Sequence, residues 1–278
     1  MLKQTFLLGS PEYYKSEDRE IDTVKAKEQW ERLKKHIESH DITVKVVPGS
    51  SSHIGSVYLT NSALIINDFA IMARFHKVSR RGEEKILAEY LKEKLGLRIL
   101  YLPEEEGLYF EGEGDIRWSH NCKHIWFGYG VGRTTLKGIE AVEEILKREL
   151  GSHTPIFHKL NLSDRKTFHI DLALLPLPNG RVLYYPTLSS AAIKQIEDVF
   201  GKQNMIKVPS KYFFACNSVW LDEKNILVPK LPYDDFRYWM YKATQMKLDE
   251  VNVNQFHLGN GSVQCMILRI WRVFPTTS

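Results

Sequence analysis

The chain has 278 residues, of which 43% are hydrophobic and 26% are charged, so it is long enough to bury a full core. Its 38 basic and 34 acidic residues give a net charge of +4 without a run of five like charges, which argues against a nucleic-acid partner. Three widely spaced cysteines argue against a disulfide framework, and no stretch approaches the roughly 18 apolar residues that span a bilayer, so we expect a cytoplasmic protein that binds a small molecule and no membrane.

Five segments with apolar residues at helical spacing recur about every fifty residues and predict helices. Their ranges are 24–39, 81–95, 136–150, 189–200 and 234–246. Three of them are followed by Gly96, Gly151 or Gly201, where a glycine in the left-handed conformation can end a helix. Ser79 and Ser189 stand where helix N-caps are expected.

Short β-rich runs fill the intervals and predict strands. These runs are ITVKVV (42–47), ALIINDFAIMARF (63–75), LRILYL (97–102), HIWFGYG (124–130), FHIDLALL (168–175), RVLYY (181–185), MIKV (205–208), SVWL (218–221), NILV (225–228) and VQCMILRI (263–270). Several strands and one helix per period predict an α/β ring of five ββαβ units rather than a doubly wound sheet. No linker or low-complexity tract divides the chain, so we expect residues 1–278 to form a single domain.

The first stretch with possible chemistry is FEGEGDIRW, residues 110–118. Glu111, Glu113 and Asp115 alternate with glycines directly before a predicted strand. In an extended segment this alternation places all three carboxylates on one side, and the glycines let a ligand approach the backbone. A solvated acidic turn is the alternative that the string alone leaves open.

The second stretch is FHIDLALL, in which His169 and Asp171 share one face of a predicted strand. A lone histidine on such a face is usually a packed core residue. A carboxylate buried beside it, however, needs a cation or several hydrogen-bond donors, which favours a functional pair.

The third stretch is HLGNGSVQCMILRI, residues 257–270, where a turn of glycine, asparagine and serine leads to Cys265. The two glycines allow a close approach of the backbone to neighbouring groups. Taken alone, Cys265 is more often an inert buried thiol than a nucleophile.

SHNCKH, residues 119–124, invites a zinc interpretation through His120, Cys122 and His124. Three ligands within five residues cannot easily share a tetrahedron, and no fourth ligand stands out. We therefore predict a hairpin turn here and no metal site. Nothing in the sequence indicates an organic cofactor either.

In this order, the Glu-Gly-x-Gly-Asp motif, the His-x-Asp motif and the late glycine-turn cysteine resemble the guanidino-group-modifying superfamily, the penteins. That superfamily includes arginine deiminases, dimethylarginine dimethylaminohydrolases, amidinotransferases and arginine dihydrolases. The similarity covers most of the chain and is closest to the amidinotransferase and arginine dihydrolase branch, as seen in VYLTNSALI (57–65), ARFHKVSRRGEE (73–84) and FGYGVGRT (127–134). It implies a five-bladed α/β propeller with pseudo-five-fold symmetry and an active site in its central channel.

The resemblance also implies the roles of the site residues. Cys265 matches the nucleophile, His169 the general acid and base, and Asp171 a carboxylate that grips the substrate's guanidinium. Glu111 would orient the histidine or bind the substrate, and Asp115 completes the acidic motif. A thiolate formed near the bound cation, with its pKa lowered by that charge, would give a covalent amidino-thioether. Water as acceptor makes the enzyme a hydrolase and an amine makes it an amidinotransferase, and the sequence leaves both open.

Further residues match the branch only in part. Arg80 and Arg133 match arginines that hold the α-carboxylate of the substrate, although each is otherwise a solvated surface charge, and Asn61 is retained. Relatives carry an aspartate where this chain has Gly55, so a carboxylate that commonly binds the guanidinium is missing. Asp22 could replace it or could cap a helix, and capping is the preferred interpretation. Plain arginine is therefore not assured as the substrate.

A non-catalytic member that binds a ligand or partner is the alternative function, because the superfamily includes a ribosome-binding translation factor. That alternative predicts loss of the nucleophile or of its acid. Cys265 and His169 both remain, which favours the enzyme. The sequence does not indicate which guanidino compound is used or the oligomeric state.

Overall fold

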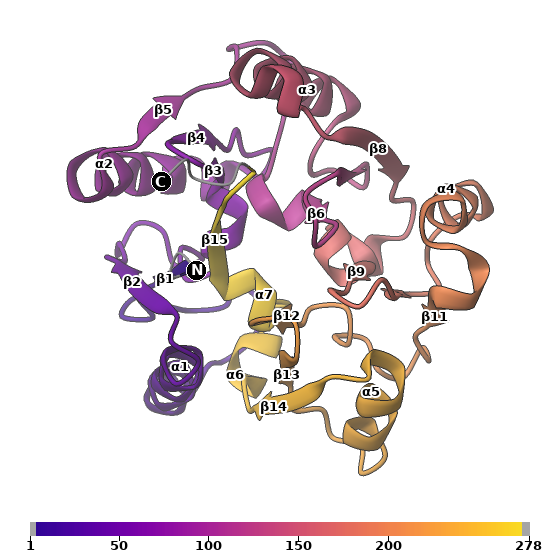
Figure 1. The fold of residues 1–278 in the computed structure, drawn as a ribbon. Helices are drawn as coiled ribbons and strands as arrows, with labels where there is room; N and C mark the ends of the chain where they lie inside the picture. Colours follow the sequence, from indigo (N-terminus) through magenta and orange to yellow (C-terminus); the bar gives the residue numbers. More distant parts are fainter. Residues whose placement is uncertain (1–3, 274–278) are drawn as a thin grey trace.

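The computed structural model describes residues 4–273 and shows a mixed α/β fold. One order of elements occurs five times in this part of the chain: two antiparallel strands, a helix, and a third strand parallel to the second. Figure 1 shows helices α1 to α5 at the outside and the strands between them and the middle of the molecule. The prediction of repeated ββαβ units is therefore confirmed.

The elements of each unit are as follows. The first unit contains β15 (Ile267–Trp271), β1 (Thr5–Gly9), α1 (Thr23–Glu38) and β2 (Thr43–Val47). The second contains β3 (Ala63–Ile66), β4 (Phe69–Met72), α2 (Glu83–Leu95) and β5 (Arg98–Leu100). The third contains β6 (Ile116–Trp118), β7 (His124–Tyr129), α3 (Leu136–Leu150) and β8 (Ile156–Asn161). The fourth contains β9 (Leu174–Pro176), β10 (Val182–Tyr184), α4 (Ser190–Phe200) and β11 (Met205–Lys207), and the fifth β12 (Val219–Trp220), β13 (Asn225–Pro229), α5 (Phe236–Thr244) and β14 (Lys247–Val251).

Strand β15 joins the two ends of the described chain. It pairs antiparallel with β1 and parallel with β3, which produces a six-stranded sheet in the order β2-β1-β15-β3-β4-β5. The other three units form separate three-stranded sheets. The segment before β15 is thereby held beside the first and second units, although it lies at the far end of the sequence.

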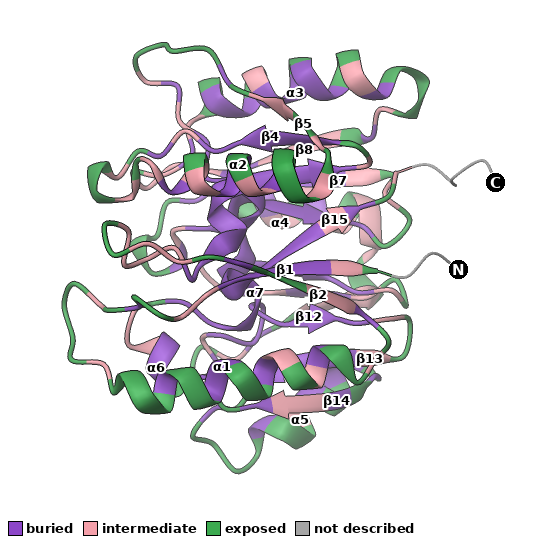
Figure 2. Cartoon of the chain, turned by 90° about the vertical axis from the view of Figure 1, so that its left-hand side faces the viewer, coloured by how far each residue is buried: buried purple, intermediate pink, exposed green. Residues whose placement is uncertain are grey.

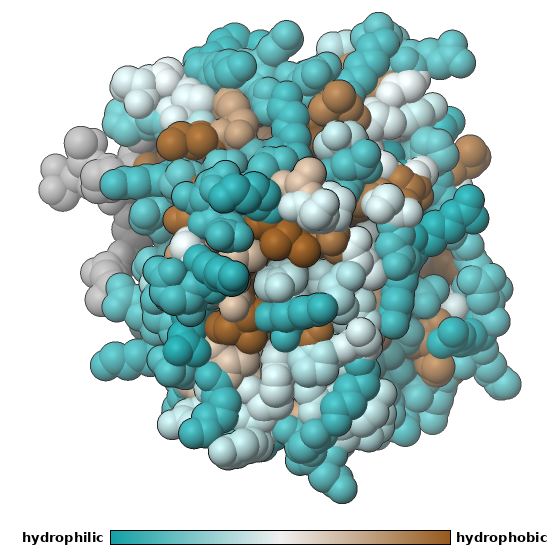
Figure 3. Space-filling view, turned by 90° about the vertical axis from the view of Figure 1, so that its right-hand side faces the viewer, coloured by the Kyte–Doolittle hydropathy of each residue, from teal (hydrophilic) through white to brown (hydrophobic). Residues whose placement is uncertain are grey.

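The outer helices bury one face each and leave the other exposed (Figure 2). On α3, Ile139, Val142 and Leu146 are fully buried at helical spacing. Burying a side chain of this kind contributes about 1.5–3 kcal/mol. The face in Figure 3 is largely hydrophilic with scattered apolar side chains, and no helix within residues 4–273 is long and apolar enough to cross a membrane.

All five predicted helices are confirmed, with ends within three residues of the expected ones. Gly96, Gly151 and Gly201 follow α2, α3 and α4 with positive φ angles of 67°, 52° and 74°, but only Gly96 adopts the predicted left-handed conformation. Ser189 caps α4, since its side chain accepts a hydrogen bond from the backbone of Ala192.

The cap predicted at Ser79 is wrong. Helix α2 begins after Gly82, which has φ 109° and no capping side chain. Ser79 instead lies in a 3₁₀ turn, η2 (Val78–Arg80), and its hydroxyl donates to Glu17 at 2.9 Å. The arginine-rich turn before α2 therefore contacts the loop that follows β1.

Three predicted extended segments are partly helical. Gly112–Asp115 forms a 3₁₀ turn, η3, so the three carboxylates of the acidic motif do not share one side. Gly112 has a positive φ of 61°, and a Cβ on it would lie 2.6 Å from the backbone of Asn61, so the turn packs closely there. In FHIDLALL the first part is a 3₁₀ turn, η6 (Ile170–Leu172), and in VQCMILRI the first four residues form α7 (Val263–Met266). Strands β1, β8 and β14 were not predicted.

Short turns precede the first strand of the units and approach one another at the middle of the molecule. They are η1 (Leu59–Ser62) before β3, η3 before β6, η6 before β9, and α7 before β15. η1 packs against η3 and α7, and η3 packs against η6. We call these segments, together with the turn at Phe214–Asn217 before β12, the inner turns.

Candidate active site

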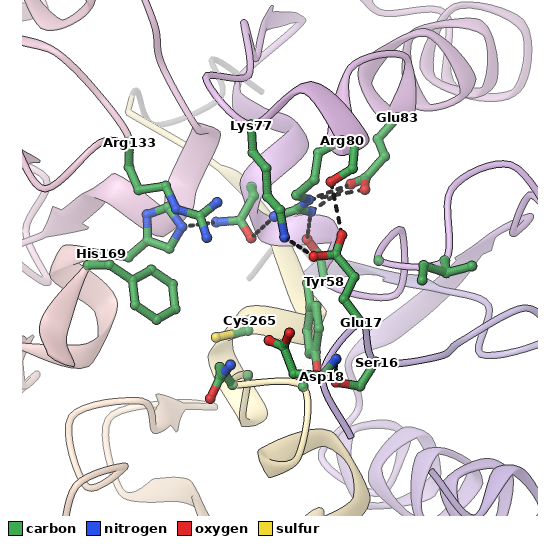
Figure 4. Close-up of a pocket in the computed structure, with 18 of the residues that line it drawn as sticks. Ser16, Glu17, Asp18, Tyr58, Lys77, Arg80, Glu83, Arg133, His169 and Cys265 are labelled. Atoms are coloured by element: carbon green, nitrogen blue, oxygen red, sulfur yellow. Dashed lines mark hydrogen bonds and ion pairs between the residues drawn. The ribbon is translucent and has the colours of Figure 1, made fainter. Parts of the chain in front are cut away.

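A cavity of about 660 Å³ lies at the inner turns, and Asn61, His169 and Cys265 contribute to its wall. Figure 4 shows His169 and Cys265 on the same side of this cavity, with Arg80 and Glu83 on the other. The charged residues that also line it are Lys15, Glu17, Asp18, Lys77, Arg80, Glu83, Arg133, Arg165 and Lys166. The mid-chain histidine and the late cysteine therefore face one common space.

Cys265 lies in α7 and is 7% exposed. Its Sγ is 3.4 Å from Oδ2 of Asp171 and 3.3 Å from Nδ2 of Asn217. Burial, followed by the negative charge of Asp171, raises the pKa of the thiol well above its ordinary value. Both effects favour the protonated thiol in the unliganded protein, and a cation bound beside it would lower the pKa.

The glycines before Cys265 are needed for close packing, as predicted. A Cβ on Gly259 would lie 2.3 Å from the hydroxyl of Tyr58, and one on Gly261 would lie 2.1 Å from the Tyr58 ring. Tyr58 in turn donates to the carbonyl of Phe256 at 2.8 Å. Any side chain at these two glycines would displace the turn that carries the cysteine.

His169 is 3% exposed and lies among three polar side chains. Its Nδ1 is 2.9 Å from Oδ2 of Asp115, and its Nε2 is 3.4 Å from both Oε2 of Glu111 and Nδ2 of Asn61. Burial acts to lower the pKa of His169, but Asp115 and Glu111 outweigh it and raise that pKa to about 9. His169 is therefore an imidazolium at neutral pH and can donate a proton.

Glu111 is fully buried and accepts a hydrogen bond from Nη1 of Arg133 at 2.9 Å. Burial acts to raise its pKa, but His169, followed by Arg133 and Arg80, lowers the pKa to about 2. Glu111 is consequently ionised over the whole physiological range.

The remaining acids of the motif differ in their surroundings. Asp115 accepts from the hydroxyl of Thr134 at 2.6 Å as well as from His169. Glu113 faces away from the histidine and accepts from the backbone of Arg269 at 3.2 Å, and burial raises its pKa to about 7 despite Arg269. Only two of the three carboxylates of the motif therefore surround the imidazole.

Asp171 lies in η6 and not on a strand, and it is fully buried. Burial raises its pKa, although Arg117 and His169 oppose that effect. Oδ1 of Asp171 and Oε1 of Glu111 are both buried without a hydrogen-bond partner among the described residues. Such carboxylate oxygens can accept N–H groups from a bound cation, and leaving them unpaired costs about 1–3 kcal/mol or more each.

Arg80 and Arg133 line the cavity, but both already have acidic partners. Arg80 donates from Nη2 to Glu83 at 2.6 Å and from Nη1 to Asn61 at 2.8 Å, and only 12% of its side chain is exposed. Arg133 binds Glu111. The interpretation of Arg80 as a solvated surface charge is therefore wrong.

The interpretation of Asp22 as a helix cap is confirmed, and the residue does not line the cavity. The residue is exposed, and its carboxylate accepts from the backbone of Lys25 at 3.0 Å at the start of α1. A different acid lies near the missing carboxylate, because a Cβ on Gly55 would be 3.3 Å from Oε1 of Glu83.

The SHNCKH segment forms the turn between β6 and β7, as predicted, and Cys122 has a positive φ of 54°. Within residues 4–273, no group of three or more histidine, cysteine or acidic side chains is arranged to hold a metal ion.

Several lining residues were missed by sequence reasoning. Glu17, Asp18 and Glu83 are ordinary surface acids in the sequence, and only the fold places them at the cavity. Asn217 lies beside the sulfur without lining the cavity, and its turn directly before the SVWL strand was the available signal.

A model of the family described as N,N dimethylarginine dimethylhydrolase, eukaryotic, matches residues 10–272. A bifunctional arginine dihydrolase/ornithine cyclodeaminase of Synechocystis is 26% identical over 249 residues, covering 88% of this chain and 33% of that protein. The chain thus spans about a third of the length of this relative. An N(G),N(G)-dimethylarginine dimethylaminohydrolase of Mycobacterium tuberculosis is 26% identical over 251 residues, covering 90% of this chain and 77% of that protein.

Solved structures show the same fold. The N-terminal domain of the cyanobacterial arginine dihydrolase ArgZ, bound to product, matches with a TM-score of 0.88 at 24% identity, over 98% of this chain and 100% of that one. A dimethylarginine dimethylaminohydrolase variant, as an adduct with S-methyl-L-thiocitrulline, matches with a TM-score of 0.78 at 22% identity, over 97% of this chain and 100% of that one.

Proposed function

Because the chain belongs to the N,N dimethylarginine dimethylhydrolase family, within the guanidino-group-modifying superfamily, we propose that it is an amidine hydrolase with Cys265 as its nucleophile. The substrate is arginine or an arginine-like guanidino compound. Water is the acceptor, because the relatives are named as an arginine dihydrolase and a dimethylarginine dimethylaminohydrolase. Amidino transfer to an amine is the less favoured reaction.

One observation carries this proposal: two buried carboxylates, each with an unpaired oxygen, lie directly behind a thiol and an imidazolium that both line one cavity. Oδ1 of Asp171 and Oε1 of Glu111 lack partners, while Cys265 and His169 reach the cavity wall. A guanidinium is planar and rich in N–H donors, so it supplies what these oxygens lack. Neutral ligands would leave the carboxylates uncompensated.

In the first half of the reaction, the guanidinium binds Asp171 and its charge lowers the pKa of the Cys265 thiol, whose proton leaves to solvent. The thiolate attacks the central carbon and a C–S bond forms. His169 gives its Nε2 proton to the leaving nitrogen, the C–N bond breaks, and ammonia or an amine departs.

In the second half, neutral His169 takes a proton from water as a C–O bond forms at the amidino carbon. The C–S bond then breaks, which regenerates the Cys265 thiolate and releases a ureido product. Glu111 and Asp115 hold the imidazole in place throughout, because they contact its two nitrogens.

The distal end of the substrate lies near the outer part of the cavity. Arg80 and Arg133 are engaged by acids, whereas Lys15, Arg165 and Lys166 have no carboxylate partner among the described contacts. We propose that these three cations attract the carboxylate of the substrate.

The five units, in this proposal, are the blades of one pseudo-five-fold propeller, and residues 1–278 form one catalytic domain. The repeated pairing of strands and the packing of the inner turns support it. Cys122, Cys216 and Cys265 are free, which supports a reducing compartment such as the cytoplasm.

Selective alkylation tests the nucleophile and its cation site together. A haloacetamidine, which mimics a guanidinium, should alkylate Cys265 much faster than the uncharged haloacetamide, and His169→Ala should slow the reaction. Ammonia, citrulline and ornithine released from arginine and its methylated, decarboxylated and shortened analogues then identify the reaction. Equal labelling by both reagents, with no product from any analogue, would leave a binding protein as the better account.

A further inference from the structure

We propose that Asn217 is a catalytic residue whose side-chain amide donates a hydrogen bond to the thiolate of Cys265. The proposal rests on Cys265 as the nucleophile, and it adds a residue that neither the sequence motifs nor the resemblance assigned. Asn217 is fully buried in the inner turn before β12.

The orientation of this amide follows from its partners. Oδ1 of Asn217 lies 3.0 Å from the backbone nitrogen of Gln264 and 3.4 Å from that of Cys265. Backbone N–H groups only donate, so the oxygen must face them. Nδ2 consequently faces Sγ at 3.3 Å and the carbonyl of Asp171 at 3.4 Å, while Oδ1 also lies 3.5 Å from Sγ. The contacts to two neighbouring turns hold one rotamer.

The groups around the sulfur act on the pKa of Cys265 in opposite directions. The carboxylate of Asp171 disfavours a thiolate, whereas the Asn217 amide and the backbone of Ser262 favour it. When a guanidinium engages Asp171, the thiol loses its acceptor there. The Asn217 N–H remains as a fixed donor at the position where negative charge develops, which is the arrangement that lowers the free energy of an anionic nucleophile without reorganisation.

The place of Asn217 in the fold is a second, independent argument. Asn61, Asn217 and Cys265 each stand two residues before the first strand of their unit, namely β3, β12 and β15. Asp115 and Asp171 stand one and three residues before β6 and β9. The inner turn of every unit thus carries one of these side chains, and Asn217 is the one in the fifth unit.

The test is the ionisation of Cys265 in Asn217→Asp. An aspartate keeps an oxygen for the two backbone donors but places a negative acceptor beside the sulfur. Ultraviolet thiolate absorbance and the rate of iodoacetamide alkylation are followed against pH, and the Cys265→Ser signal is subtracted to remove Cys122 and Cys216. We expect the apparent pKa to rise by about one unit or more, so alkylation at fixed pH slows about tenfold.

Asn252→Asp is the matched control, since it makes the same change at an exposed residue away from the cavity. It should leave the profile unchanged. If Asn217→Asp does not fold, Asn217→Ser decides, because its hydroxyl can meet the backbone donors but is too short to replace the amide at the sulfur. A wild-type profile in the folded variant would overturn the proposal. These readouts need no substrate, so absence of hydrolysis in the wild type would overturn the proposed function and leave this result standing.

Discussion

At the residue scale, the acid–base behaviour of His169 is determined by the carboxylates at its two nitrogens. Burial alone would lower the pKa of His169 and favour the neutral imidazole. The carboxylates of Asp115 and Glu111 outweigh burial and raise that pKa to about 9. A proton donor of this kind is charged below its pKa and loses its proton as the pH rises through it. The rate of C–N cleavage should therefore be constant through neutral pH and fall near pH 9.

Asp115→Asn should move that fall to lower pH, because removing the negative charge at Nδ1 lowers the pKa of His169. We expect kcat at about pH 8 to drop roughly 10- to 100-fold, because each unit by which the pKa of His169 falls below 8 leaves about tenfold less of the protonated acid. The measurement is kcat against pH.

Glu113→Gln is the matched control, since it alters the neighbouring acid of the same motif, which contacts Arg269 and not His169. In this variant, the fall of kcat at alkaline pH should occur at the same pH as in the wild type. An unshifted limb in Asp115→Asn would mean that His169 is not the acid that titrates.

At the element scale, the long periodic elements were predictable and the short inner turns were not. Helical spacing identified α1 to α5 because each buries one continuous face. The FHIDLALL and VQCMILRI runs looked like strands because their apolar residues are buried on several sides, yet η6 and α7 bend there to bring His169 and Cys265 toward the cavity. Tertiary packing overrides local preference at these candidate site residues.

The same contrast explains the candidate site. Cys265, His169, Asp171, Glu111 and Asp115 could be predicted because they lie in motifs that resemble a family. Glu83 and Asn217 could not, since their roles depend on contacts with Arg80 and with the cysteine turn that no sequence spacing encodes.

Asp22→Ala tests the role of Asp22 as the N-cap of α1. Loss of the N-cap should cost about 0.5–2 kcal/mol in the free energy of unfolding, measured with urea. kcat/KM should stay unchanged, because Asp22 does not line the cavity. Asp22→Ser should restore the stability, and a raised KM in Asp22→Ala would instead indicate a substrate ligand.

Gly261→Ala tests the turn before Cys265. The added methyl would lie 2.1 Å from the ring of buried Tyr58, so we expect a loss of about 1–3 kcal/mol in stability and a slower alkylation of Cys265. Thermal unfolding and haloacetamidine labelling check both. Wild-type stability together with a wild-type labelling rate would show that the turn accommodates the added methyl group.

At the scale of the whole molecule, strand β15 between β1 and β3 makes the site depend on both ends of the described chain. The fold brings together inner turns that are separated by about fifty residues each in the sequence. The modest net charge of +4 is unevenly placed, because Lys15, Arg165 and Lys166 gather at the cavity.

These cations should attract a carboxylate-bearing substrate through the solvent. We expect kcat/KM to fall several-fold as ionic strength rises. Salt screens the attraction between the cations and the substrate, and the screening length, about 10 Å at 0.1 M salt, shortens as salt is added. Arg165→Glu should lower kcat/KM and flatten the salt dependence, while Lys202→Glu, an exposed charge that does not line the cavity, should do neither. Equal effects of the two variants would contradict this role of the cavity.

The most direct test of the central claim is mass spectrometry of the His169→Ala variant after incubation with S-methyl-L-thiocitrulline. Methanethiolate is a good leaving group that needs no proton from His169, whereas release of the product does need the histidine to activate water. A covalent amidino adduct should therefore accumulate on the peptide that contains Cys265. Unmodified protein, or an adduct on Cys122 or Cys216, would contradict the assignment of Cys265 as the nucleophile of a guanidinium site.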